Sequence, residues 1–330
     1  MRAVVAHGYG GPEVLAVDEI AEPRPGPGQI RVRIRATALN PADLRTLSGA
    51  LRDLTPLRFP YVLGSDFAGT VTETGPGVTT YAVGDEVFGV GLPRATGRMA
   101  TRLSDPPSLT TGTMAEYAVF EADTPALARR PDRLAPAHAA TLPIPGLTAL
   151  ALLRAAPATG SVLVLGAGGG VGGAVVPLLA ATGAHVIATA IADDEEYVTG
   201  LGAAELIDYR TVDTVAETRR RYPGGVDTLV NLALPGPALV DASSALRPGG
   251  RLLNAAFPSP DPAAFEGRDL TVATVYASAT PGDLDRLAGY ALDGTLPSTV
   301  SRRYPLARAP RAYADLAHRH VRGKLVVTTG

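Results

Sequence analysis

Two patterns of apolar and polar residues follow one another along the chain. In residues 1–120, short apolar runs are separated by Pro, Gly and Asp, a pattern typical of antiparallel strands joined by turns. From residue 136 to about 275, apolar strands alternate with helical stretches, which predicts a doubly wound parallel sheet. The first runs are 3–6, 30–36, 67–72, 86–90 and 115–120; the later ones are 162–165, 186–189, 205–207, 228–231, 251–254 and 270–275.

The first pattern returns at the end of the chain. A helix predicted at about 281–292 leads to a polar turn and a strand at 323–327. We therefore expect the α/β domain to be inserted into a mostly antiparallel, barrel-like domain. The expected division is 1–125 for the first part of the barrel-like domain, 126–275 for the α/β domain and 276–330 for the return.

A glycine-rich turn follows the strand predicted at 162–165. The eight residues 166–173 include six glycines, and a second apolar strand follows one helix later, as in a dinucleotide-binding βαβ unit. The N–H groups and dipole at the start of a helix favour a pyrophosphate, although glycines can also serve a purely steric turn. We predict a Rossmann domain whose phosphate-binding residues are Gly166, Gly168, Gly169, Gly170, Val171 and Gly172.

Composition excludes several classes of protein. The 330 residues, 46% of them hydrophobic, suffice for two domains, and a net charge of −2 leaves no basic excess for nucleic acid. Gly and Pro interrupt the longest apolar segments, and Met1 leads into a strand-like run, so we expect a cytoplasmic protein without a membrane partner. The lack of cysteine excludes disulfides, Cys-ligated zinc and a Cys nucleophile.

Several motifs occur along the chain in the order typical of one enzyme family. They are GGPEVL at 10–15, NPAD at 40–43, LGSDFAG at 63–69, VGDEV at 83–87, LRPGGR at 246–251 and GK at 323–324. With them the chain resembles the zinc-independent quinone oxidoreductase (zeta-crystallin-like) branch of the medium-chain dehydrogenase/reductase superfamily. The resemblance implies a GroES-like catalytic domain holding the Rossmann domain, a nicotinamide cofactor and a homodimer.

The resemblance also accounts for the missing cysteines. Zinc-containing members have Cys-His where this chain has Asn40-Pro41, and Gly-His-Glu where it has Gly64-Ser65-Asp66. Asn, Pro and Ser do not replace Cys and His in a tetrahedral zinc site, so we expect no catalytic metal. Without a Lewis acid a simple ketone is hard to reduce, whereas a quinone or an α,β-unsaturated carbonyl delocalises the charge that hydride transfer creates. We therefore expect one of the latter as substrate.

The form of the cofactor depends on the second strand of the βαβ unit. NAD-binding domains place Asp or Glu at its end, about 20 residues after the glycines, where this chain has 189–191, Thr-Ala-Ile. NADPH is therefore expected, with Tyr209 and Arg210 as candidates near its phosphate. The acidic run 193–196 follows at once. It either repels that phosphate or forms a solvated helix start, and NADH stays the alternative.

Further site residues are implied by the resemblance. The expected cofactor contacts outside the glycine turn are Thr148, Thr189, Asn231, Ala256, Phe257 and Lys324. His320 matches the family's terminal pattern together with Lys324, but it is equally well explained as a surface histidine. The catalytic candidates are Asn40 and Asp43, with Tyr61, Tyr276 or water as proton donor. Arg45 is a candidate for binding the substrate, although it could instead form a surface ion pair. The other substrate candidates are Arg94, Arg98 and Arg102. They lie in the long segment 92–113, which is either a binding lid or a disordered loop.

Two alternative functions stay open. One is a dedicated enoyl reductase of a secondary-metabolite pathway, in which the arginines of 92–113 clamp an acidic substrate. The other is a catalytically weak binding or structural homologue, because a fold does not by itself guarantee an activity. Titration with NADPH and NADH separates the enzyme from the binding protein.

Overall fold

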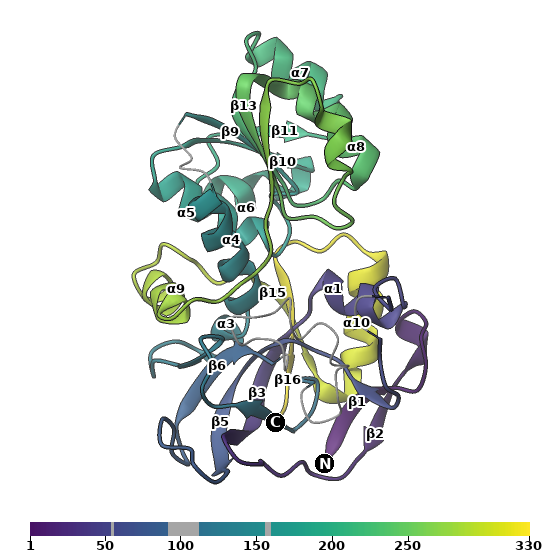
Figure 1. The fold of residues 1–330 in the computed structure, drawn as a ribbon, viewed down its shortest axis with the longest axis vertical. Helices are drawn as coiled ribbons and strands as arrows, with labels where there is room; N and C mark the ends of the chain where they lie inside the picture. The colour runs from purple at the N-terminus through teal and green to yellow at the C-terminus, as the bar shows by residue number, and fades with distance from the viewer. Residues whose placement is uncertain (54–55, 92–111, 156–159) are drawn as a thin grey trace. The chain divides into compact units, whose positions relative to one another are not determined.

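The computed structural model describes residues 1–53, 56–91, 112–155 and 160–330, which form two compact units (Figure 1). Unit 1 consists of Met1–Ile144, Ser278–Asp293 and Ser298–Gly330, and unit 2 of Pro145–Ala277 and Gly294–Pro297. The predicted insertion of one domain into the other is confirmed. Unit 2 begins later than residue 126 because the strands before Ile144 pair within the sheet of unit 1.

Unit 1 is built mainly from antiparallel strands. Its larger sheet has the order β15-β16-β3-β5-β6-β8, with β7 also paired to β3, and its smaller sheet has the order β2-β1-β4. The pair β15–β16 is parallel. The strands are β1 (Arg2–Ala6), β2 (Leu15–Glu19), β3 (Gln29–Ala38), β4 (Tyr61–Val62), β5 (Asp66–Thr74), β6 (Glu86–Val90), β7 (Tyr117–Glu121), β8 (Leu127–Arg129), β15 (Val300–Pro305) and β16 (Lys324–Thr328).

Short helices complete unit 1. They are α1 (Pro41–Leu47), α3 (Pro136–Ala139), α9 (Asp283–Leu292) and α10 (Ala309–His318). Proline at the first position suits α1, because that N–H has no helical partner. Helix α9 confirms the helix predicted at 281–292, and it begins after Gly282, whose φ is 84°. One buried cluster joins α10 to the small sheet, with Tyr313 fully buried in it.

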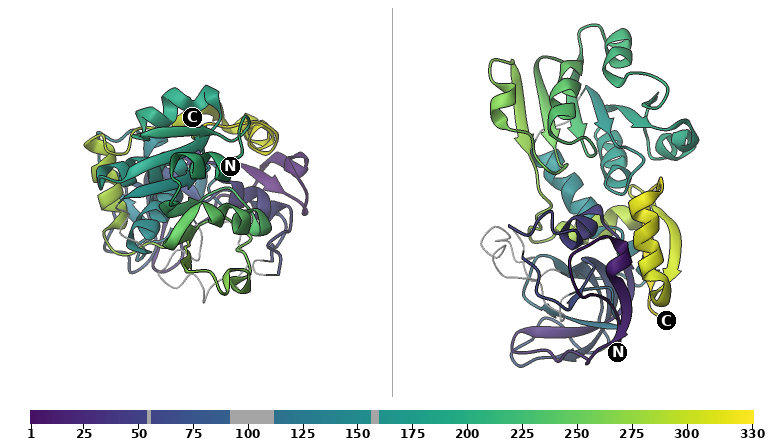
Figure 2. Two further views of the ribbon diagram at one scale, coloured as in Figure 1. Left: turned by 90° about the horizontal axis from the view of Figure 1, so that it is seen from above. Right: turned by 90° about the vertical axis from the view of Figure 1, so that its right-hand side faces the viewer.

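Unit 2 contains the predicted doubly wound sheet of six parallel strands in the order β11-β10-β9-β12-β13-β14. Helices α5 and α6 cover one face, and α7 and α8 cover the other (Figures 1 and 2). The strands are β9 (Ser161–Leu165), β10 (His185–Ala190), β11 (Glu205–Asp208), β12 (Val226–Asn231), β13 (Leu246–Asn254) and β14 (Leu270–Thr274). The helices are α4 (Pro143–Ala155), α5 (Gly172–Ala181), α6 (Glu195–Gly200), α7 (Thr214–Arg221) and α8 (Gly236–Ala242).

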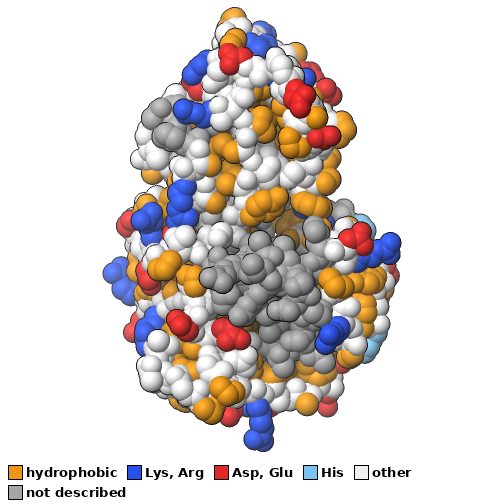
Figure 3. Space-filling model, viewed as in Figure 1, with side chains coloured by type: hydrophobic (Ala, Val, Ile, Leu, Met, Phe, Trp, Pro, Cys, Tyr) orange, Lys and Arg blue, Asp and Glu red, His pale blue; other side chains and the backbone are white. Residues whose placement is uncertain are grey.

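The surface agrees with the small net charge. On the face drawn in Figure 3, Lys and Arg side chains are interspersed with Asp and Glu among the residues shown in colour. Within the described ranges, no helix is both long enough and apolar enough to cross a membrane.

Candidate active site and cofactor site

The glycine turn joins β9 to α5 in unit 2. Gly166 has a φ of 86°, and a Cβ at Gly172 would lie 2.2 Å from the carbonyl oxygen of Ala167, so both positions require glycine. Thr189 at the end of β10 braces the turn: its Oγ1 accepts from the N–H of Gly166 at 3.1 Å, and its carbonyl from that of Ala167 at 3.2 Å. The turn leads directly into the N-terminus of α5, where the positive end of the helix dipole fits a pyrophosphate.

The acidic run 193–196 lies in a turn and a helix start after β10. Three of its four residues are exposed, but Asp194 is only 3% exposed. A Cβ at Gly168 would lie 2.7 Å from Asp194 Oδ2, so this carboxylate lies against the glycine turn. The expectation of NADPH assumed that the acids are solvated, and Asp194 does not fit that assumption.

Paired asparagines end two neighbouring strands at the carboxyl edge of the sheet. Asn231 on β12 donates from Nδ2 to Asn254 Oδ1 on β13 at 2.8 Å, and its own Oδ1 accepts from the N–H of Leu234 at 2.9 Å. Asn254 donates to the carbonyl of Ala256 at 3.0 Å and accepts from its N–H at 3.2 Å. These two side chains thus shape the loops 232–234 and 255–257.

The other predicted residues of unit 2 have different environments. Thr148 is buried on α4, whereas Tyr276 is 63% exposed. Tyr209 and Arg210 follow β11 and are exposed, and the backbone N–H of Arg210 donates to the Asp208 carboxylate at 2.9 Å. Phe257 is half-buried in the loop after β13.

A buried polar cluster lies in unit 1 around Asp66, which is fully buried. Its Oδ2 accepts from Asn40 Nδ2 at 3.0 Å and lies 3.5 Å from Lys324 Nζ, and its Oδ1 accepts from the N–H of Ile144 at 2.9 Å. Burial raises the pKa of Asp66, and the Lys324 charge and the hydrogen bonds oppose that shift. One ammonium and two N–H donors therefore offset the cost of burying the negative charge of Asp66.

Lys324, the only lysine of the chain, points into this cluster and is 4% exposed. Its Nζ donates to Asn40 Oδ1 at 2.6 Å and to the carbonyl of Leu39 at 2.8 Å. Burial lowers the pKa of Lys324, and the nearby carboxylates raise it. Both ends of the Asn40 amide are held within the cluster, which gives Asn40 a defined orientation.

Asp43 on α1 is the second carboxylate of the cluster and is 6% exposed. It accepts hydrogen bonds from the Asn40 N–H at 2.9 Å, Tyr313 Oη at 3.2 Å and Ser65 Oγ at 3.2 Å. Burial raises the pKa of Asp43 to about 6, against the opposing effect of the Asn40 N–H and Lys324. Burial also raises the pKa of Tyr313, so its hydroxyl remains a donor to Asp43.

The other candidates of unit 1 have different environments, and three of them lie outside the described residues. Tyr61 is buried on β4, and His320 is exposed. Arg45 on α1 is half-buried, and burial lowers the pKa of its guanidinium. Arg94, Arg98 and Arg102 lie outside the described residues.

Sequence reasoning missed several of these contacts. Tyr313 and Ser65 had no assigned role, because the hydrogen bond from Tyr313 to Asp43 spans 270 positions and no local pattern announces it. Asn254 could have been found, since two successive strands of the predicted sheet both end in Asn.

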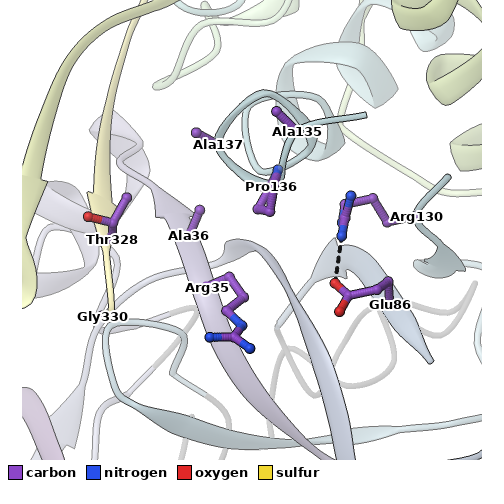
Figure 4. A pocket seen from close by; sticks show the side chains of 9 residues that line it. All are labelled: Arg35, Ala36, Glu86, Arg130, Ala135, Pro136, Ala137, Thr328 and Gly330. Carbon is purple, nitrogen blue, oxygen red and sulfur yellow. Dashed lines mark hydrogen bonds and ion pairs between the residues drawn. The ribbon is translucent and has the colours of Figure 1, made fainter. Parts of the chain in front are cut away.

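A separate cavity of about 440 Å³ lies in unit 1, and Figure 4 draws its lining side chains. Arg130 lies at its edge and forms an ion pair with Glu86 at 2.6 Å, which agrees with the lowered pKa of Glu86. None of the predicted site residues lines this cavity. It is therefore distinct from the buried polar cluster around Asp66.

The fold and these sites define an oxidoreductase class in which a Rossmann domain is combined with a GroES-like domain. Residues 26–132 match the family model "Alcohol dehydrogenase GroES-like domain", and residues 201–327 match "Zinc-binding dehydrogenase". The chain is 30% identical to the chloroplast envelope quinone oxidoreductase homolog of Arabidopsis thaliana, over 99% of this chain and 98% of that protein.

Two further similarities extend this result. The structure of the quinone oxidoreductase from Coxiella burnetii covers 99% of both chains with a TM-score of 0.85 and 27% identity. A mycocerosic acid synthase-like polyketide synthase of Mycobacterium tuberculosis is 31% identical over 96% of this chain but only 15% of its own length. The chain belongs to the quinone oxidoreductase branch of the medium-chain dehydrogenase/reductase superfamily, whose members use a nicotinamide cofactor.

One of the matched family models is described as a zinc-binding dehydrogenase, so the residues of unit 1 are compared with the ligands that zinc requires. At the expected ligand positions stand Asn40, Ser65 and Asp66, and the Lys324 ammonium already contacts Asn40 Oδ1 at 2.6 Å. Such a donor set lacks the thiolates and imidazoles that zinc prefers. In the described part of the chain, no group of three or more His, Cys, Asp or Glu is arranged to hold a metal. The residues present at this position do not fit zinc.

Proposed function

We propose that the protein is a zinc-free oxidoreductase that transfers hydride from a reduced nicotinamide dinucleotide to a quinone or to the β-carbon of an α,β-unsaturated carbonyl. The observation that carries the proposal is the contact of the Lys324 ammonium with Asn40 and Asp66, where relatives with zinc have metal ligands. Similarity to quinone oxidoreductases over 99% of the chain supports the substrate class.

The residues of this chain would contribute binding and orientation. The glycine turn and the first turn of α5 would hold the pyrophosphate, and the loops shaped by Asn231 and Asn254 would contact the nicotinamide end. When bound, the nicotinamide supplies the hydride. Because no covalent nucleophile is needed, positioning and electrostatic stabilisation would account for the rate.

The proton that completes the reduction needs a separate source. Tyr61, Tyr276 or water is the proposed donor, and the exposure of Tyr276 supports exchange of its proton with solvent. We also propose that arginine side chains bind an acidic substrate, and the candidates are Arg45, Arg94, Arg98 and Arg102.

The proposed assembly is a homodimer in the cytoplasm. The edge strand β14 supports it, because among the described strands it pairs with β13 alone and leaves Val272 37% exposed, and an open edge favours pairing with a second copy. Light scattering that returns the mass of one 33.9 kDa chain would contradict the dimer.

The decisive assay follows oxidation of NADH and NADPH with a benzoquinone, with cyclohexenone and with cyclohexanone, in the presence of a chelator. We expect turnover with the quinone or the enone, none with the saturated ketone, and no effect of the chelator. Turnover of the saturated ketone that depends on added zinc would contradict the proposal. Failure to bind either dinucleotide would favour the binding or structural homologue.

A dedicated enoyl reductase is the second candidate. It is favoured by the 31% identity to a segment of a polyketide synthase. An enoyl thioester added to the same assay distinguishes the two. A kcat/KM for the thioester far above those for the quinone and the enone would identify the enoyl reductase.

A further inference from the structure

The C-terminal part of unit 1 concentrates positive charge in a way that the net charge of the chain does not reveal. Residues 302–322 contain six arginines and a single acid, Asp315, whereas acids outnumber Lys and Arg by 32 to 30 over the whole chain. A local excess of one charge attracts partners of the opposite charge. All six arginines are exposed: Arg302, Arg303, Arg308, Arg311, Arg319 and Arg322.

Asp315 on α10 gathers three of these arginines (Figure 1). Arg311 and Arg319 are four residues before and after it, the spacing at which side chains meet along a helix. Their Nε atoms lie 3.1 Å and 3.0 Å from Asp315 Oδ1. Strand β15 supplies the third arginine, since Arg302 Nη1 lies 3.3 Å from Asp315 Oδ2. Two elements thus bring three guanidinium groups to one carboxylate.

The carboxylate lies beneath the surface and the guanidinium groups lie on it. The side chain of Asp315 is 6% exposed, whereas those of the three arginines are 55% to 60% exposed. Asp315 Oδ2 also accepts a hydrogen bond from the buried Tyr304 Oη at 2.7 Å. This hydrogen bond and the three arginines hold the pKa of Asp315 below its ordinary value, so the carboxylate is ionised. Asp315 therefore fixes the arginines from below.

This arrangement leaves charge and donor groups for a ligand. One carboxylate balances only one of the three positive charges. A guanidinium has five N–H donors, of which Nε carries one. Because Arg311 and Arg319 approach Asp315 through Nε, both terminal nitrogens of each stay outside these ion pairs. Such pairs of parallel N–H groups bind carboxylates in a bidentate manner.

The neighbouring residues favour an acidic protein over other anionic partners. Tyr304 and Tyr313, the aromatic residues of 302–322, are buried and offer no platform for stacking a nucleic-acid base. Ala309, Ala312 and Tyr313 pack in the core of unit 1, so the apolar side of α10 is not free to enter a bilayer. Between the arginines, the small exposed Ala317 lets a partner backbone approach closely.

We propose that Arg302, Arg311 and Arg319 form a docking site for an acidic segment of a partner protein, whose Asp and Glu carboxylates pair with the three guanidinium groups. Asp315 is the positioning residue of this site. Arginine is enriched at protein interfaces, where oriented guanidinium groups contribute much of the binding energy. The site contains none of the residues assigned to the cofactor or the substrate, so it is independent of the proposed reaction.

An acidic peptide serves as the probe for the full-length chain. Fluorescence anisotropy follows binding of a labelled peptide of alternating Glu and Ala, and of its Gln counterpart, at low ionic strength. We expect the Glu peptide alone to bind, and added salt to weaken the binding. The double variant Arg311→Gln/Arg319→Gln should raise Kd at least about tenfold, because hydrogen bonds between charged groups are lost.

Two further variants distinguish an oriented site from general charge attraction. Arg286→Gln removes an exposed arginine from α9 of the same unit and should change Kd less than about twofold. Asp315→Asn makes the protein more positive but releases the arginines, so we expect weaker binding. Tighter binding in Asp315→Asn would overturn the proposal. If Asp315→Asn has a lower melting temperature, equal losses in Arg286→Gln and the double variant would overturn it instead.

Other anionic partners are tested with the same proteins. The probes are vesicles of phosphatidylglycerol and phosphatidylcholine, and a single-stranded oligothymidylate. We expect neither to lose affinity in the double variant more than the Glu peptide does. Failure of the Glu peptide to bind the wild type would overturn the site. Binding of the vesicles or the oligonucleotide that is tighter than peptide binding, and that the double variant abolishes, would overturn the acidic protein as partner.

Discussion

At the scale of single residues, the buried cluster of unit 1 concentrates charge where water is excluded. Two carboxylates, Asp43 and Asp66, share one ammonium, that of Lys324, and all three are at most 6% exposed. Buried charges are costly unless they are paired and hydrogen-bonded, and here Asp66 has the closer cation. Asp43 accepts hydrogen bonds from neutral donors only, and burial raises its pKa to about 6.

The raised pKa of Asp43 predicts a pH dependence of stability. Its pKa rises from an ordinary value of 3.8 to about 6 in the folded protein, so the folded state binds the extra proton between these values. The contribution of Asp43 to the unfolding free energy is therefore fully present below about pH 4 and is lost as the pH rises through 6. The loss should be about 3 kcal/mol of unfolding free energy. Burial also raises the pKa of Asp66, which adds to the same slope.

Urea unfolding of the wild type and of Asp43→Asn between pH 4 and pH 7 measures this effect. The variant keeps an amide whose oxygen can accept from Tyr313 and the Asn40 N–H and whose nitrogen can donate to Ser65, and its stability should fall less over this range. Asp123→Asn, an exposed carboxylate of unit 1, serves as the control and should retain the wild-type slope. Parallel curves for the wild type and Asp43→Asn would show that Asp43 does not titrate there.

At the scale of elements, local patterns predicted the parts of the fold that local chemistry determines. The strand β9, the glycine turn, α5 and β10 follow directly from an apolar run, six glycines and a second apolar run. Strand β15 and helix α10 had no such marker. The hydrogen bond from Lys324 to Asn40 spans 284 positions, and only folding brings the two together. The direction of Asp194 depends on the turn 192–194, which composition does not reveal.

The glycine turn supplies a prediction at this scale. In Gly172→Ala the new Cβ would lie 2.2 Å from a backbone oxygen, which cannot move as a side chain end can. We expect the turn to open, the melting temperature to fall and dinucleotide binding to weaken at least about tenfold, because the N–H groups no longer converge on the pyrophosphate. Gly224→Ala, where a Cβ meets nothing within 4 Å, should change neither quantity. Unchanged binding in Gly172→Ala would place the phosphates elsewhere.

At the scale of the whole molecule, the chain divides its tasks between two units. Unit 2 carries the glycine turn, Asp194 and the asparagine pair, and unit 1 carries the cluster that contains a lysine in place of metal ligands. The chain leaves unit 1 after Ile144, returns to it at Ser278, and crosses once more into unit 2 for Gly294–Pro297 before it ends in unit 1. Membership in the quinone oxidoreductase branch connects both units to one oxidoreductase activity.

The destination of the hydride tests the central claim most directly. The protein is given NADH or NADPH labelled with deuterium at the transferable position of the nicotinamide, together with cyclohexenone and a chelator, and the product is analysed by NMR. We predict cyclohexanone with deuterium on the β-carbon. Deuterium on the carbonyl carbon of an alcohol product, or a product without deuterium on carbon, would contradict zinc-free hydride transfer to a conjugated acceptor.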